Sequence, residues 1–283
     1  MYEGLCETII SVSLSAPKPG VFLDTVKYVL VLATAVEVVL LAISWDAQGN
    51  NLKLIPTAYT VPTDNVIMVK VVGSQLGRVF MAGNNGNMYE LDYQSTESSW
   101  AVVFGSKTTH KCQKINHSAW NLVQFVPSFL KTMLDLGDCL VDMAVDDARC
   151  VLYTVSKRGV LSAFYLGADG KAAHPPLKRD FRLFSEVEHF LDRSRVPESS
   201  PSAKLFRENA ASMIIVGMYV VPVTESRKVH LVVLLNNGMR VYLRLVGADG
   251  MAFAPAPATD APGGAFGLPG ASARSPDSLE VRC

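Results

Sequence analysis

Three segments of the chain share one local pattern, in which an apolar strand runs into a glycine-containing turn and a second strand follows. The segments are Arg78–Ala82 with Met88–Tyr93, Val151–Thr154 with Val160–Leu166, and Leu231–Leu235 with Val241–Leu243. Their turns contain Asn85-Gly86, Gly159 and Asn237-Gly238. Asn-Gly favours a type I′ turn, because both central residues of that turn need a positive φ. The pattern therefore predicts three β-hairpins, two of them closed by type I′ turns.

A further short apolar run precedes each hairpin, at residues 66–72, 140–145 and 213–221. Four-stranded antiparallel units repeated in this way are typical of the blades of a β-propeller. Gly86 and Gly159 are 73 residues apart, and Gly159 and Gly238 are 79 apart, whereas compact propeller repeats take about 40 to 50. The excess predicts insertions at residues 94–136 and 168–211.

The run from Tyr28 to Trp45 has eighteen residues with Glu37 as its only charge. This length approaches that of a membrane-spanning helix. Against a span, Glu37 would lie near the bilayer centre at a cost of about 2.5 to 3.5 kcal/mol, and valine favours strands. The alternative is two buried strands, residues 28–33 and 37–44.

The charge balance gives no overall field, since 26 basic residues face 26 acidic ones in the 283-residue chain. Binding to nucleic acid or an anionic membrane would then depend on local contacts, and no sequence-specific nucleic acid partner is predicted. The five cysteines are scattered and odd in number, which indicates neither a disulfide framework nor a zinc cluster.

Two groups of possible metal ligands are better interpreted as structural. His110, Cys112 and His117 lack the further ligands that tetrahedral zinc needs. Asp142, Asp146 and Asp147 lack the spacing of a calcium loop, and residues 146–149 are predicted to form a hairpin turn. The sequence also contains no G-x-S-x-G, phosphate loop or H-E-x-x-H motif. We therefore predict no catalytic, metal or cofactor site, and no enzyme activity.

Residues 116–136 are unusual for a propeller insertion because they predict an amphipathic helix. From Pro127, a favoured first helical position, apolar and polar side chains fall on separate stripes. The helix could pack on the flank of the propeller, or it could insert into a membrane surface. On the second interpretation, the membrane-contact residues are Trp120, Phe125, Phe129, Leu130, Met133 and Leu134.

The composition changes after residue 246. Residues 247–276 are rich in Ala, Gly and Pro and are predicted to be a disordered loop or tail, because such a segment buries little apolar surface. Residues 277–283 are predicted to form a truncated strand. The domain prediction is therefore a partial propeller over residues 1–246, followed by these two segments.

Several short motifs resemble, in order, the N-terminal propeller of the 155-kDa nucleoporins. They are Glu7-Thr8-Ile9-Ile10, Lys18-Pro19-Gly20-Val21-Phe22, Leu30-Val31-Leu32-Ala33-Thr34, Val61-Pro62-Thr63-Asp64-Asn65, Gly77-Arg78-Val79-Phe80-Met81-Ala82-Gly83 with Gly86 and Tyr89-Glu90, and Lys111-Cys112-Gln113-Lys114-Ile115-Asn116-His117-Ser118. The resemblance extends from about Tyr2 to Leu245.

This resemblance implies an all-β fold, a partial β-propeller of about four to five blades from a seven-bladed ring, with a short amphipathic helical insertion. It implies a scaffold in the inner ring of the nuclear pore complex, with other inner-ring nucleoporins and the nuclear envelope membrane as partners, acting in pore assembly and nucleocytoplasmic transport. A blade expected before Tyr2 and a solenoid expected after Cys283 are missing, so a fragment, a truncated gene model or a short form is expected. A generic propeller adaptor and a propeller enzyme are the alternatives.

Overall fold

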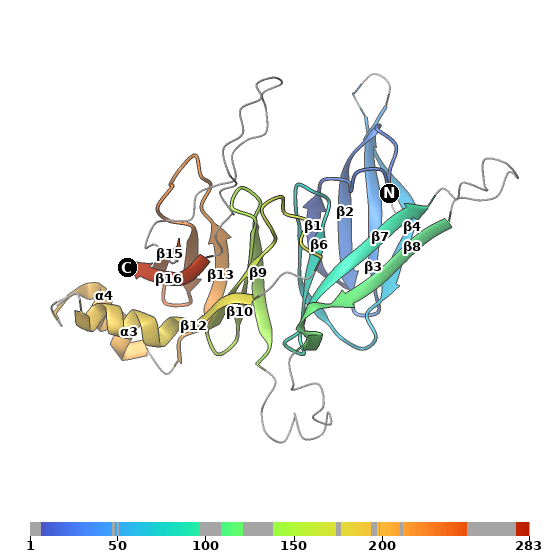
Figure 1. The fold of residues 1–283 in the computed structure, drawn as a ribbon. Coiled ribbons are helices and arrows are strands. Elements are labelled where there is room, and N and C mark those ends of the chain that lie inside the picture. Colours follow the sequence, from blue (N-terminus) through green and yellow to red (C-terminus); the bar gives the residue numbers. More distant parts are fainter. Residues whose placement is uncertain are drawn as a thin grey trace, which may run out of the picture. The chain divides into compact units, whose positions relative to one another are not determined.

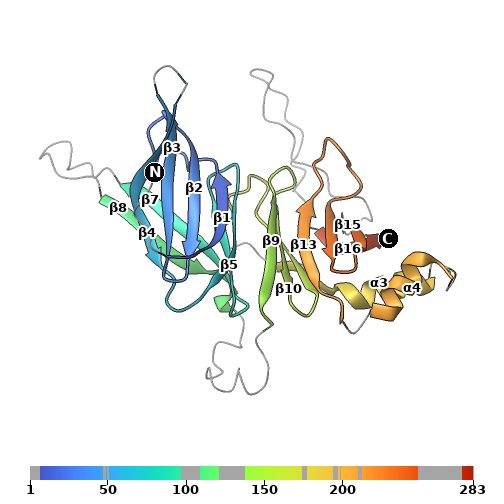
Figure 2. The same ribbon diagram turned by 180° about the vertical axis from the view of Figure 1, so that it is seen from behind.

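The computed structural model describes residues 7–46, 49, 51–96, 109–120, 138–173, 177–193, 197, 199–209, 212–247 and 276–282. It divides into two compact units, residues 1–143 and 144–283. Four antiparallel sheets account for the strands of the described part, and each sheet has four strands in sequence order. This meander is the connectivity of propeller blades, so the predicted all-β, propeller-like fold is confirmed (Figures 1 and 2).

The first unit contains sheets A and B. Sheet A consists of β1 (Ile9–Ser15), β2 (Val26–Thr34), β3 (Glu37–Trp45) and β4 (Leu52–Pro62). Sheet B consists of β5 (Met68–Gly73), β6 (Val79–Gly83), β7 (Met88–Thr96) and β8 (Thr109–Asn116), followed by the 3₁₀ helix η1 (His117–Trp120).

Sheets C and D follow, and the boundary between the two units falls inside the first strand of sheet C. Sheet C consists of β9 (Leu140–Asp146), β10 (Val151–Ser156), β11 (Val160–Tyr165) and β12 (Leu177–Arg182). Sheet D consists of β13 (Ile215–Val220), β14 (Leu231–Leu235), β15 (Arg240–Gly247) and β16 (Pro276–Arg282). The helices α3 (Leu183–Arg193) and α4 (Pro201–Asn209) lie between the two sheets in sequence.

The apolar run that resembled a membrane span forms β2 and β3, as the strand alternative predicted. The run is continuous rather than alternating because sheet A buries side chains on both faces. Val31 and Leu40 pack in one cluster with residues of sheet B, while Leu32 and Leu41 belong to a second cluster on the opposite face. No helix in the described ranges is long and apolar enough to cross a membrane.

The three predicted hairpins are present in successive sheets, as β6–β7, β10–β11 and β14–β15. The type I′ prediction for the Asn-Gly turns is wrong. Gly86 and Gly238 have positive φ, but Asn85 and Asn237 are not among the described residues that do. In each turn the glycine N–H donates to the carbonyl three residues earlier, from Gly86 to Gly83 and from Gly238 to Leu235. These are the bonds of a type I turn followed by a glycine bulge, which requires one left-handed residue instead of two.

The two predicted insertions contain regular strands, so the insertion boundaries are wrong. The fourth strand of sheet B, β8, lies inside residues 94–136, and the fourth strand of sheet C, β12, lies inside residues 168–211. Both are the outermost strands in sequence order, and their sequences THKCQKIN and LKRDFR lack the apolar pattern by which strands are recognised.

Helices α3 and α4 were not predicted. Leu183, Val187 and Leu191 follow one another at four-residue spacing on α3, and all three are buried in the apolar core shared by sheets C and D. From α4, Ala203 and Phe206 join the same core. The strand expected over residues 277–283 is β16, which pairs with β15 and completes sheet D, while residues 248–275 between them lie outside the described part.

Candidate interaction site

The predicted membrane-contact residues lie at or beyond the end of the described part of sheet B. Phe125, Phe129, Leu130, Met133 and Leu134 are outside the described residues. Trp120 is the last residue of η1, but its side chain is also outside the description. The structure therefore shows how this segment begins, and the membrane assignment stays a prediction.

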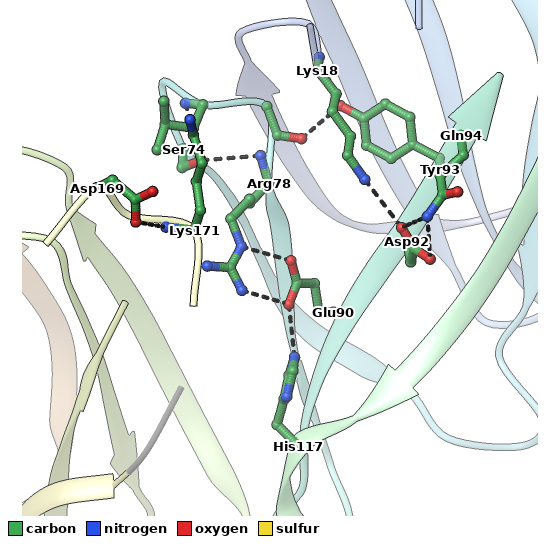
Figure 3. A network of polar contacts seen from close by, with 12 residues as sticks. Lys18, Ser74, Arg78, Glu90, Asp92, Tyr93, Gln94, His117, Asp169 and Lys171 are labelled. Atoms are coloured by element: carbon green, nitrogen blue, oxygen red, sulfur yellow. Dashed lines mark hydrogen bonds and ion pairs between the residues drawn. The ribbon is translucent and has the colours of Figure 1, made fainter. Parts of the chain in front are cut away.

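A buried polar network holds the start of that segment against sheet B (Figure 3). Arg78 on β6 donates two hydrogen bonds to Glu90 on β7, from Nε to Oε1 at 2.7 Å and from Nη2 to Oε2 at 2.8 Å. His117 at the start of η1 places Nε2 2.7 Å from Glu90 Oε2. Because an ionised carboxylate only accepts hydrogen bonds, this nitrogen of His117 carries the proton.

The charge of Glu90 is stabilised in this network. Burial alone would raise the pKa of its carboxyl, but the hydrogen bonds and positive charge of Arg78, with the hydrogen bond of His117, hold that pKa below its ordinary value. The Arg78 guanidinium also lies over the ring of Phe80, 4.8 Å from its centroid. The network therefore links β6, β7 and η1 through one carboxylate.

Two further hydrogen bonds fix η1. The Ser118 Oγ atom accepts the backbone N–H of Met88 at 2.9 Å, and Asn116 Oδ1 accepts the N–H of Ser118 at 2.9 Å. The motif that suggested metal ligands thus has structural contacts. His110 Nδ1 lies 3.0 Å from Tyr59 Oη, and burial raises the pKa of Cys112 to about 11. No cluster of metal-ligand side chains occurs in the part of the chain that the structure describes.

The aspartates near residue 146 also have a structural role. Asp146 Oδ2 lies 2.6 Å from Nη1 of Arg149, and both side chains are almost fully buried. Arg149 additionally donates to the carbonyl oxygens of Val221 and Ser226 in the loop between β13 and β14. The predicted turn at residues 146–149 therefore ends in an arginine that ties sheet C to sheet D.

The loop between β1 and β2 is bound closely to sheet B. Lys18 Nζ forms a 3.1 Å ion pair with Asp92, and the Lys18 N–H donates to Tyr93 Oη (Figure 3). Tyr93 in turn donates to the carbonyl of Gly77 at 2.6 Å. A Cβ atom at Gly77 would lie 2.4 Å from the Lys18 Cα. The Lys-Pro-Gly motif thus connects two blades.

One surface feature was not anticipated from the sequence. The register of sheet A puts a set of exposed apolar side chains on the face opposite sheet B: Val12, Leu14, Tyr28, Trp45, Leu52 and Leu54. We call this set the outer apolar face. Tyr28 and Trp45 form an edge-to-face pair with ring centroids 6.1 Å apart. Exposed apolar patches of this kind mark contact surfaces. The sequence feature that could have revealed this face is that β2 and β3 carry apolar residues on both faces of the sheet.

Comparison with known proteins gives the family. Residues 1–274 match the family model described as "Nup133 N terminal like" nucleoporin. The chain belongs to this nucleoporin family. Among curated nucleoporins, Nup154 of Drosophila melanogaster is 39% identical over 165 residues, covering 58% of this chain and 11% of that protein. Nucleoporin NUP170 of Chaetomium thermophilum is 32% identical over 252 residues, covering 86% of this chain and 16% of that protein.

A solved nucleoporin structure has the same fold. The N-terminal domain of Chaetomium thermophilum Nup170, crystallised in complex with Nup53, matches 99% of this chain with a TM-score of 0.69 and 25% identity, and this chain covers 33% of it. This nucleoporin chain therefore spans less than a fifth of the length of the curated relatives it matches.

Proposed function

We propose that this chain is a structural, non-enzymatic component of the nuclear pore complex, located at the nuclear envelope and acting in the scaffold of the inner ring. The observation that carries the proposal is the agreement of sequence and fold. A family match over residues 1–274 coincides with four blade-like sheets that align over 99% of the chain with the N-terminal domain of Nup170.

The described polar clusters support a scaffold better than a catalyst. The Glu90, Asp92 and Asp146 carboxylates each pair with a cation and join separate strands or loops. Structural ion-pair networks of this kind also shift pKa values, so these shifts do not mark a catalytic site. A propeller of this kind presents its edges, faces and loops to other proteins.

The proposed protein partners are other nucleoporins of the inner ring. Support comes from the solved Nup170 domain, which was crystallised with Nup53. The test is binding of the full 283-residue chain to purified Chaetomium Nup53, followed by cross-linking and mass spectrometry. Cross-links that cluster on one sheet are expected. Absence of binding to Nup53 and to every other inner-ring nucleoporin in the same assay would contradict the scaffold role.

The proposed membrane contact is the segment from Ser118 to Leu136. Insertion of the six apolar side chains into the membrane would supply the binding free energy, on the order of 1.5 to 3 kcal/mol for each. Lys131 alone attracts anionic lipid weakly. Ser118 is fixed to sheet B by Met88 and by the adjacent His117–Glu90 bond, so the segment starts from an ordered base.

Flotation with small liposomes tests this contact. The double substitution Phe129→Asp with Leu130→Asp is expected to release the chain from the vesicles, while added salt has little effect. Substituting two exposed apolar residues of the outer apolar face, Val12→Asp with Leu14→Asp, is the matched control and is expected to retain binding. If release follows the control pair instead, the membrane assignment of residues 118–136 is wrong.

A further inference from the structure

The first half of β4 differs from every other strand of sheet A in its exposure. Leu52, Lys53, Leu54, Ile55 and Pro56 are exposed in succession, and Leu52, Leu54 and Ile55 have 55%, 41% and 44% of their surface accessible. The adjoining β3 is buried from Val38 to Ile43. β4 is the terminal strand of the sheet order, so this half-strand is an apolar sheet edge.

The second half of β4 is covered. Strand β8 reaches it through the contact of His110 with Tyr59 and through Lys114, whose Nζ donates to the carbonyl of Thr63 just after the strand at 2.8 Å. The hydrogen bonds and the ring contact described between β4 and β8 involve Tyr59 and Pro62 of β4. In the described ranges no strand pairs with residues 52–56 on the side away from β3.

The edge is held in a defined register. The turn before it is closed by the Asp46 N–H donating to the carbonyl of Asn51 at 3.0 Å and by Asn51 Nδ2 donating to Asp46 at 2.6 Å. From there Leu52 to Pro56 pair with Trp45 to Leu41. A fixed, extended backbone loses little conformational entropy when another strand pairs with it.

Pro56 sets the orientation of the backbone. Proline has no N–H to donate, so a strand that contains it places the proline nitrogen toward the open edge. Every second residue of a strand directs its N–H and C=O groups toward the same edge. Leu54 and Leu52, two and four residues before Pro56, therefore direct these groups toward the open edge. These groups are the ones an added strand would use.

We propose that residues 52–56 are a docking edge for an extended segment of another protein, which adds to sheet A as a fifth strand. This mode of recognition supplies main-chain hydrogen bonds along the edge and side-chain contacts on alternate positions. The segment would place apolar side chains beside Leu52 and Leu54 on the outer apolar face. On the other face it would place an acidic side chain beside Lys53 and a side chain such as threonine, which has a methyl group, beside Ile55.

The charge of Lys53 favours pairing of this edge with a strand of another protein over pairing with a second copy of this chain. The Lys53 side chain is exposed and forms no ion pair with any of the residues that the structure describes. If two copies paired antiparallel through this edge, both Lys53 side chains would lie on one face at diagonal positions, where like charges repel. Lysine and proline are also the residues that protect edges from self-association. The segment that docks on this edge therefore belongs to a partner protein and carries a carboxylate. This proposal is independent of the proposed membrane contact.

The test uses the full chain and a fluorescein-labelled peptide of eight residues, alternating valine and threonine with one central glutamate. Fluorescence anisotropy is expected to show saturable binding. The same peptide with alternate backbone nitrogens methylated keeps its side chains but loses its edge hydrogen bonds, and is expected to bind at least tenfold more weakly. Undetectable binding of the parent peptide at millimolar concentration, or equal binding of both peptides, would overturn the proposal.

Charge reversal provides a second test, because an unfolded variant could not show a reversed preference between two peptides. Lys53→Glu is expected to weaken binding of the glutamate peptide at least threefold and to strengthen binding of a matching lysine peptide. Lys111→Glu, an exposed lysine on β8, is the control and is expected to leave the preference unchanged. If both variants shift the peptide preference equally, the peptides respond to the net charge of the chain and not to Lys53, and the edge assignment is wrong. A dimer in sedimentation velocity whose formation excludes the peptide would identify a second copy as the occupant of the edge instead.

Discussion

Single residues account for the tightest links between strands, and Glu90 is the clearest case. Its carboxylate accepts hydrogen bonds from Arg78 and His117 in a largely buried site. Removing one partner of such a pair leaves an uncompensated charge, which costs about 3 to 5 kcal/mol. We expect Arg78→Met to lower the unfolding free energy by about that amount in urea titrations. Arg207→Met, which breaks the exposed pair with Asp192, is the control and is expected to cost below about 1 kcal/mol.

His230 makes stability depend on pH. Burial, and then the positive charge of Arg149, lower the pKa of His230 from 6.5 to about 4 in the folded chain. Below pH 6.5 the unfolded chain takes up a proton that the folded chain does not, so stability falls as the pH drops from 6.5 to 4.

The loss from this histidine is at most about 1.4 kcal/mol per pH unit. Urea unfolding at a series of pH values is expected to show a steeper fall for the parent chain than for His230→Phe. Parallel curves for the two proteins would show that His230 is not the group responsible.

At the scale of elements, the packing of the β1–β2 loop on sheet B can be isolated with two glycines. Gly77 and Gly20 both have positive φ, at 76° and 77°, but a Cβ at Gly77 would meet the Lys18 backbone at 2.4 Å, whereas nothing lies within 4 Å at Gly20. Alanine at either site costs about 1 to 2 kcal/mol for the left-handed backbone, and Gly77→Ala adds about 1 to 3 kcal/mol for the clash. A thermal shift that is equal for both variants would refute the close contact.

The elements also show what a sequence can reveal. Strands β2 and β3 were predictable because they are apolar on both faces, and the hairpins because glycine closes each turn. Strands β8 and β12 were not, since an outermost strand is held by backbone bonds and polar contacts such as Lys114 with Thr63 and carries no apolar period. Helix α3 was missed although Leu183, Val187 and Leu191 carry a helical period, because Glu186 and Glu188 on either side of Val187 led us to interpret the stretch as a charged insertion. The docking edge depends on register and exposure, which the sequence LKLIP does not reveal.

At the scale of the whole molecule, the match over residues 1–274 places this chain in a nucleoporin family. Its four sheets repeat one meander, and 99% of this chain aligns with 33% of the solved Nup170 domain. The two units each bury their own core, sheet A against sheet B and sheet C against sheet D. Such rigid modules suit a scaffold that must keep several contact surfaces at fixed positions. We therefore expect the chain to serve as a scaffold part of the nuclear pore.

The most direct measurement is fluorescence imaging of the tagged chain in living cells, combined with photobleaching at the nuclear rim. We expect a punctate rim that coincides with pores and recovers slowly, because scaffold subunits exchange little. A diffuse signal through the cytoplasm or nucleoplasm, or complete recovery within seconds, would contradict a scaffold role.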